Sequence, residues 1–134
     1  MTPAFDTNII IYAFATGVKA DIARALMAAG GVITVQNLNE FTNVAVRKLD
    51  FSWEEIAQAV DHITTLCGEP RAIDLSAHHD ARAIAERYQL SFYDALIVAA
   101  ALGAGCTTLY SEDMQDGMVV EGRLTIINPF AALA

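Results

Sequence analysis

The sequence predicts an α/β fold, a three-layer sandwich whose central, mainly parallel β-sheet is flanked by helices on both faces. Three observations lead to this prediction. The 134 residues suffice for one domain with a real core, so residues 1–134 are expected to form a single domain. Short apolar or β-branched runs alternate with helical stretches, and no repeat, linker or low-complexity tract interrupts them. Strand–helix alternation of this kind builds a parallel sheet covered on both sides.

The first half of the chain predicts two strands, each followed by helices. Gly30-Gly31 ends one helix, and Ser52 with Glu55 forms a capping box that opens another. The expected elements are a strand at 2–5, a turn at 6–8 leading into a helix to about residue 15, a helix at 21–29, a strand at 32–35, a helix at about 37–49, and a helix from the Ser52 cap to about residue 67.

The second half continues the same alternation. Ser91 followed by Asp94 repeats the cap spacing and predicts a helix to about Leu102. The other expected elements are a strand at 71–74, a helix at 76–88, a strand at 106–110 and a last strand at 124–127, ahead of Pro129.

Composition limits the possible function classes. Eight Lys and Arg against sixteen Asp and Glu give a formal charge of −8, which argues against a broad basic surface for nucleic acid but not against phosphate binding through metal ions. The longest uncharged run is broken by glycines and the N-terminus lacks a basic region, so neither a membrane span nor a secretory signal is predicted. Cys67 and Cys106 are expected to be reduced, buried thiols of a cytoplasmic protein.

A mean hydropathy of +0.37 is high for a soluble chain. It indicates either an interior rich in small apolar residues or a surface covered by another chain.

Four carboxylates stand where strands end or helices begin, each beside apolar residues: Asp6, Glu40, Asp94 and Asp113. Burying an ionised carboxylate costs several kcal/mol unless it is paired or bound to a cation. In an open parallel sheet, ligands bind beyond the carboxyl ends of the strands, where Asp6 and Asp113 are expected. We therefore expect the four acids to converge on a divalent metal site.

Oxygen ligands without a suitable His or Cys favour Mg²⁺ or Mn²⁺ over zinc. Four acids could hold two ions about 4 Å apart, an arrangement that cleaves phosphodiesters. Thr7, Asn8 and Ser111 could orient ligands or bind phosphate as neutral donors. Each acid also has a structural explanation, since Asp94 could cap a helix, Asp6 form a turn, and Glu40 lie in solvent.

Five motifs in order along the chain resemble those of the PIN-domain ribonucleases, specifically the VapC-type toxins of bacterial toxin–antitoxin pairs. The motifs are FDTNI at 5–9, NEF at 39–41, SFYDALI at 91–97, LYSEDMQDG at 109–117 and INPF at 127–130. The resemblance covers essentially the whole chain.

The resemblance implies a Mg²⁺- or Mn²⁺-dependent endoribonuclease that cuts RNA. Asp6 and Asp94 would be the most direct metal ligands, Asp113 would complete the site, and Glu40 would act directly or through water. Asp116 would supply an outer-sphere contact, and Ser111 matches the small hydroxyl residue that precedes the last acidic pair. Glu112 is expected to face solvent because neighbouring side chains diverge.

The resemblance also implies a cognate antitoxin and a homodimer. Apolar positions of the first helices would serve the dimer contact and an apolar groove for the antitoxin; they include Ile10, Ile11, Phe14 and Leu49.

Several other residues are expected to lie outside the site. His62, His78 and His79 fall in none of the acidic motifs, and Trp53 is expected to pack against the core or a helix. Arg47 and Lys48 are explained by the dipole at the end of their helix, with contact to RNA phosphates as the alternative.

Three other functions remain open: a solitary PIN-domain nuclease, a non-catalytic PIN-like module that binds RNA or protein, and a phosphatase or dehalogenase with Asp6 as nucleophile. The last is weakened because Asn8 stands where such a phosphatase would place its second Asp.

Overall fold

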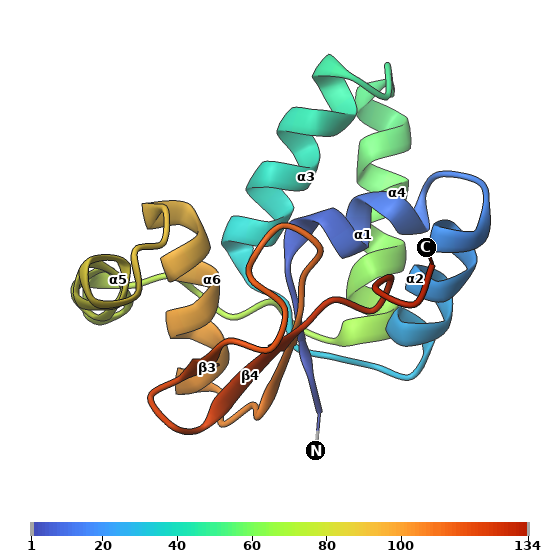
Figure 1. Ribbon diagram of the computed structural model, residues 1–134. Coiled ribbons are helices and arrows are strands. Elements are labelled where there is room, and N and C mark those ends of the chain that lie inside the picture. The colour runs from blue at the N-terminus through green and yellow to red at the C-terminus, as the bar shows by residue number, and fades with distance from the viewer. Residues whose placement is uncertain (1, 134) are drawn as a thin grey trace.

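A computed structural model describes residues 2–133 and confirms the α/β prediction, with six helices and one four-stranded sheet in that range (Figure 1). The strand order is β1-β2-β4-β3. β1, β2 and β4 are parallel, and β3 pairs antiparallel with β4. The strands are β1 Ala4–Phe5, β2 Thr108–Tyr110, β3 Val119–Val120 and β4 Leu124–Ile127. The helices are α1 Thr7–Ala13, α2 Val18–Ala28, α3 Val35–Arg47, α4 Trp53–Cys67, α5 Leu75–Tyr88 and α6 Phe92–Gly103.

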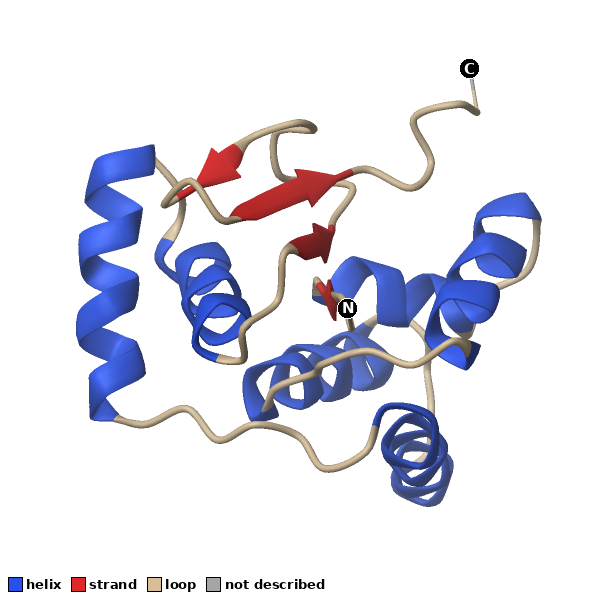
Figure 2. Cartoon of the chain, turned by 90° about the horizontal axis from the view of Figure 1, so that it is seen from below, coloured by secondary structure: helices blue, strands red, loops and turns tan. Residues whose placement is uncertain are grey.

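The sheet separates two hydrophobic cores, as a three-layer sandwich requires. Successive residues of a strand point to opposite faces. Ala4 and Leu109 accordingly pack in the core under α5 and α6. Phe5 and Tyr110 pack on the other side, in the core formed with α1, α2, α3 and α4. Figures 1 and 2 show α5 and α6 together on one side of the strands and the remaining helices on the other.

Helix caps account for most of the predicted helix positions. The Ser52 and Glu55 capping box is present at the start of α4, and Ser91 caps α6 by accepting a hydrogen bond from Asp94 N. Helices α1, α2, α3 and α5 begin earlier than predicted. α2 starts at Val18, and α3 starts at Val35 because Thr34 and Asn37 form a further capping box.

The predicted strands at 32–35 and 71–74 are wrong. Within residues 2–133 these segments make only single parallel bridges, Ala4 with Val32 and Thr34 with Arg71. At 32–35 the physical reason is the α3 cap: Thr34 and Val35 are β-branched, but the cap turns the backbone into a helix there. At 71–74, Asp74 is the N-cap of the next helix, α5. The short strand β3 was not predicted, since its two residues lie in a tight hairpin with β4.

Gly31 allows the chain to pass close to β1. A Cβ on Gly31 would lie 2.1 Å from Phe5 Cε2, inside the fully buried ring. Only glycine fits at this position without movement of the ring. In the part of the chain that the structure describes, no helix has the length and apolar character needed to cross a bilayer.

Candidate active site

The four predicted acids line one cavity of about 330 Å³ at the carboxyl ends of β1 and β2. Asp6 follows β1, Asp113 lies in the loop after β2, Glu40 lies on α3, and Asp94 lies in the first turn of α6. The cavity lining consists of Asp6, Thr7, Asn8, Ile11, Glu40, Asn43, Val44, Asp94 and Asp113. Segments separated by more than 100 residues therefore meet at the sheet edge where the sequence places them.

Asp6 is the most constrained of the four acids. It caps α1 and is only 5% exposed. Its Oδ1 accepts a hydrogen bond from Thr7 N at 2.7 Å, and its Oδ2 accepts from Ser111 Oγ at 2.7 Å and Asn8 Nδ2 at 3.3 Å. These donors fix the carboxylate orientation at the base of the cavity.

The pKa of Asp6 is raised to about 6 by several effects together, of which burial is the largest. The hydrogen bonds from Ser111 and Thr7 favour the ionised form and offset part of this effect. The negative charges of Asp94 and Glu40 raise the pKa further. The local environment therefore opposes a negative charge at Asp6 when no cation balances it.

Glu40 is positioned by a buried polar network that begins at Asn37. The Asn37 side chain is 1% exposed and donates through Nδ2 to Phe5 O at 3.2 Å and Thr7 Oγ1 at 3.0 Å. Thr7 Oγ1 then donates to Glu40 Oε1 at 2.6 Å. Sequence reasoning missed Asn37, although its spacing from Thr34 is that of a capping box.

Asn8 links the two acids at the strand ends. Its Nδ2 lies 3.3 Å from Asp6 Oδ2 and 3.1 Å from Asp113 Oδ2. Asp113 is exposed, whereas Asp94 is half-buried. Burial raises the pKa of Asp94, a hydrogen bond with Ser91 lowers it, and the charge of Asp113 raises it.

The four carboxylates that line the cavity are chemically suited to a hard divalent cation. The ion pairs between side chains of residues 2–133 involve other acids: Lys19 with Glu112, Arg24 with Asp21, and Arg87 with Glu121. The four cavity acids thus have no basic side chain to neutralise them in this part of the chain, and their oxygen atoms suit Mg²⁺ or Mn²⁺.

The convergence of the acids is looser than the sequence predicts. Over residues 2–133, no three His, Cys, Asp or Glu side chains come close enough together to hold a metal ion as they stand. Hydrogen bonds hold Glu40 to Thr7 and Asp113 to Asn8 instead. These side chains would have to rotate toward a shared cation.

The remaining predicted residues divide into two groups. Thr7, Asn8 and Ser111 contact the acids directly. Asp116 is not part of the cavity lining, and its Oδ1 accepts a hydrogen bond from Asn128 N at 2.8 Å. Its outer-sphere role stays a prediction.

Two expectations about neighbouring residues are wrong. Glu112 does not face solvent freely, because its carboxylate accepts hydrogen bonds from Tyr12 Oη at 2.6 Å and Lys19 Nζ at 2.5 Å. The backbone can turn this side chain toward α1 and α2 while Asp113 faces the cavity. Trp53 is not a packing residue: it is 71% exposed, at the first position of α4.

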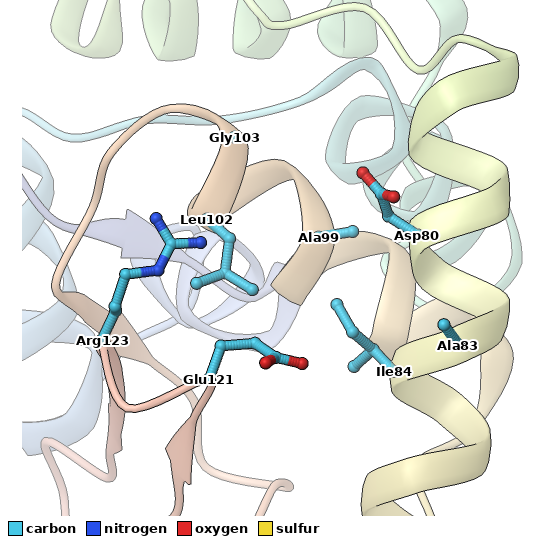
Figure 3. Close-up of a pocket in the computed structure, with 8 residues that line it drawn as sticks. All are labelled: Asp80, Ala83, Ile84, Ala99, Leu102, Gly103, Glu121 and Arg123. Atoms are coloured by element: carbon cyan, nitrogen blue, oxygen red, sulfur yellow. The ribbon is translucent and has the colours of Figure 1, made fainter.

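A larger cavity of about 460 Å³ lies elsewhere, between α5, α6 and the β3–β4 turn (Figure 3). Its charged residues are Asp80, Glu121 and Arg123, and Glu121 is also paired with Arg87. This cavity contains charges of both signs, whereas the cavity at the strand ends contains four carboxylates and no basic residue. None of the three histidines lines the acidic cavity, as predicted.

Comparison with known proteins gives the family. A profile of the PIN domain matches residues 4–115. A toxin–antitoxin complex from Klebsiella pneumoniae has a similar chain, with a TM-score of 0.73, 19% sequence identity, and coverage of 96% of this chain and 98% of that chain. The VapBC2 complex from Rickettsia felis, bound to a DNA fragment from its promoter, has a TM-score of 0.62, 18% identity, and coverage of 94% and 97%.

No curated protein matches the sequence significantly. At these identities the two solved complexes support the fold, while the family follows from the PIN domain match over most of the chain. The chain therefore belongs to the PIN-domain family, as its sequence motifs predict, rather than to the phosphatases or dehalogenases.

Proposed function

We propose that this PIN-domain protein is a Mg²⁺- or Mn²⁺-dependent endoribonuclease. The observation that carries the proposal is the single cavity lined by Asp6, Glu40, Asp94 and Asp113 without a basic partner in the described part of the chain. Burial and mutual repulsion raise the pKa of Asp6 and of Asp94. A divalent cation would relieve both effects, because it stabilises the ionised carboxylates.

The residues of the cavity take different roles in this proposal. Asp6 and Asp94 are the most direct ligands, Asp113 completes the site, and Glu40 acts directly or through a water. Ser111 and Thr7 hold the Asp6 carboxylate in one orientation, and Asn8 keeps Asp113 beside it. When bound, the cation supplies Lewis-acid chemistry for ionising the attacking water and stabilising charge on the phosphodiester.

We further propose that the protein acts as the toxin of a toxin–antitoxin pair. The similar folds of the chains in two toxin–antitoxin complexes support this role. An apolar cavity of about 290 Å³, lined in part by Phe14, is the proposed binding site for an antitoxin segment. The lining comprises Ala13, Phe14, Arg24, Met27, Ala28, His62 and Leu66.

The apolar positions predicted for partners differ in accessibility. Ile10 is fully buried, so the expectation that it contacts a partner is wrong. Ile11, Phe14 and Leu49 are only partly buried and remain available to an antitoxin or to a second copy in a homodimer.

The nuclease is tested by incubating purified protein with RNA in Mg²⁺ or Mn²⁺. We expect cleavage that stops with EDTA and falls by roughly 100-fold or more in Asp6→Asn and Asp94→Asn, since each removes a charge from the cation site. Asp80→Asn is the matched control, because Asp80 lines the separate cavity of Figure 3. Equal RNA cleavage by wild type and the two cavity variants would contradict the nuclease and favour a non-catalytic module.

The toxin role needs its own test. A short reading frame beside the gene should encode a protein that binds this chain and abolishes RNA cleavage. If no such protein inhibits it, a solitary PIN nuclease is the better description.

A further inference from the structure

One face of α3 leads away from the acidic cavity toward basic side chains. Glu40, Asn43, Val44 and Arg47 have the spacing i, i+3, i+4 and i+7, which places them on one side of a helix. The first three of these residues line the acidic cavity. The face of α3 that carries Glu40 therefore continues past the site toward the end of the helix.

A second cavity, of about 390 Å³, lies along this continuation. Its lining consists of Asn43, Val44, Arg47 and Lys48. Asn43 and Val44 line both cavities, so the two adjoin along α3. They form one groove, acidic at the Glu40 end and basic at the Arg47 end, which we call the α3 groove.

The charge at the basic end of the α3 groove is not neutralised by neighbours. Arg47 and Lys48 are exposed and take part in none of the ion pairs found among residues 2–133. The other arginines that line cavities have acids beside them. Arg71 lies with Glu69 and Asp74 and Arg123 with Asp80 and Glu121 in the same cavity lining, and Arg24 pairs with Asp21. Stabilisation of the helix dipole explains basic residues at the end of α3, but it does not require them to line a cavity joined to the site.

The distance along α3 suits contact with RNA beyond the cleaved bond. Seven residues at 1.5 Å per residue separate Glu40 and Arg47 by about 10.5 Å along the helix axis. This separation is longer than a hydrogen bond of about 3 Å, so the two side chains can contact different groups of a bound strand. Asn43 lies between them and can donate to the strand as a neutral side chain.

We propose that the RNA strand runs along the α3 groove and that Arg47 and Lys48 bind its phosphates beside the cleavage site. This inference rests on the proposed ribonuclease function. A chain with a formal charge of −8 repels RNA at long range, so local cations are needed to hold the strand against it. Arg47 and Lys48 lie where an RNA strand that leaves the acidic cavity along α3 would pass.

The test measures RNA binding by Arg47→Gln/Lys48→Gln in an Asp94→Asn background, which allows binding without rapid cleavage. Fluorescence anisotropy follows a labelled single-stranded RNA of about 12 nucleotides with Mg²⁺ present, at salt concentrations from about 50 to 200 mM. We expect about ten-fold weaker binding at the middle of this range. We also expect the slope of log K against log salt to fall in magnitude by about 1.4, because each lost phosphate contact contributes about 0.7.

Arg82→Gln/Arg123→Gln in the same background is the matched control. It also removes two positive charges, but from exposed positions outside the α3 groove. Binding close to that of the Asp94→Asn parent, with an unchanged salt slope, is expected for this control. Thermal melts of both double variants check that the fold is intact.

The outcomes separate the inference from the function on which it rests. If wild type cleaves RNA but the Arg47/Lys48 variant binds like its parent, or both double variants weaken binding equally, the inference is wrong and the nuclease stands. An acidic protein segment as the true occupant of the groove would give the first of these results. If wild type neither binds nor cleaves RNA, both the inference and the nuclease fail.

Discussion

The buried carboxylate of Asp6 opposes folding when it is ionised. Its carboxylate is buried and accepts three hydrogen bonds, yet its pKa is still raised from 3.8 to about 6. A shift of this size corresponds to about 3 kcal/mol of destabilisation of the ionised form at neutral pH. A residue kept only as a helix cap would not need this burial, so the cost favours a role in binding a cation.

The pH dependence of stability tests this account of Asp6. Between pH 3.8 and about 6 the folded state binds more protons at Asp6 than the unfolded state does, so this contribution to stability falls as pH rises through that window. In EDTA, Asp6→Asn is therefore expected to be more stable than wild type at pH 7.5, by up to about 3 kcal/mol. The gain should shrink toward pH 4. Urea unfolding at several pH values measures the difference.

Glu55→Gln is the comparison variant, because the pKa of Glu55 is shifted in the opposite direction from that of Asp6. Hydrogen bonds from Ser52 lower the pKa of Glu55, so its contribution to stability is present at neutral pH and is lost as pH falls. This variant should show no gain at pH 7.5. A gain for Glu55→Gln equal to that for Asp6→Asn would contradict a specific penalty at Asp6.

Individual residues were predictable where sequence neighbours revealed them. Asp6 and Asp94 stand out because apolar residues flank them, and Ser111 because it precedes the last acids. Lys19 and Tyr12 could not be found this way, since their contacts with Glu112 span 93 and 100 residues of sequence. Such partners depend on how α1 and α2 pack near the β2 end, which local patterns do not specify.

At the scale of elements, α3 joins the fold to the site. Its capping residue Asn37 bonds to Phe5 O in β1 and to Thr7 Oγ1 in α1, and Thr7 bonds to Glu40 on α3. Three elements are therefore held together by one buried amide side chain. The position of Glu40 depends on this network as well as on the helix itself.

Asn37→Ala should accordingly destabilise the protein by roughly 2–4 kcal/mol. It leaves Phe5 O and Thr34 N without a partner in the interior, and each unsatisfied buried group costs about 1–3 kcal/mol. Chemical denaturation measures the loss. Ser52→Ala is the control, because it removes an exposed cap of α4 and should cost only about 1 kcal/mol. Equal losses in the two variants would contradict a special role for the Asn37 network.

Elements were predictable to the extent that local signals set them. α4 and α6 begin where Ser52 and Ser91 predict, because a cap is a contact within four residues. The strand predicted at 32–35 was wrong because β propensity at Thr34 and Val35 was overridden by the α3 cap. β3 was missed because its two residues form a strand only through pairing with β4.

At the scale of the whole molecule, the sheet both divides the two cores and assembles the site. Asp94 lies on α6, which packs on one face, and Glu40 lies on α3, which packs on the other. Asp6 and Asp113 lie at the strand ends between them. No subset of elements brings the four acids together, so a cation bound by them would couple to the stability of the entire fold.

Metal binding should therefore raise the melting temperature of the whole protein. A ligand that binds only the folded state at 100 times its Kd stabilises it by about 2.7 kcal/mol. For a chain of 134 residues this corresponds to an increase of about 10 °C. Thermal unfolding followed by circular dichroism, in EDTA and then in Mg²⁺ or Mn²⁺, measures the shift without reference to RNA cleavage.

The size of the shift in variants identifies the ligands. Asp94→Asn and Asp113→Asn should reduce it strongly, since each removes a carboxylate from the cavity, whereas Asp80→Asn should retain it. Asp6→Asn should lose the shift while starting from a higher melting temperature in EDTA, because the same charge that binds the cation destabilises the metal-free fold. A shift that persists in all three cavity variants would mean that the cation binds elsewhere, and an unchanged wild-type melting temperature at saturating metal would contradict the site itself.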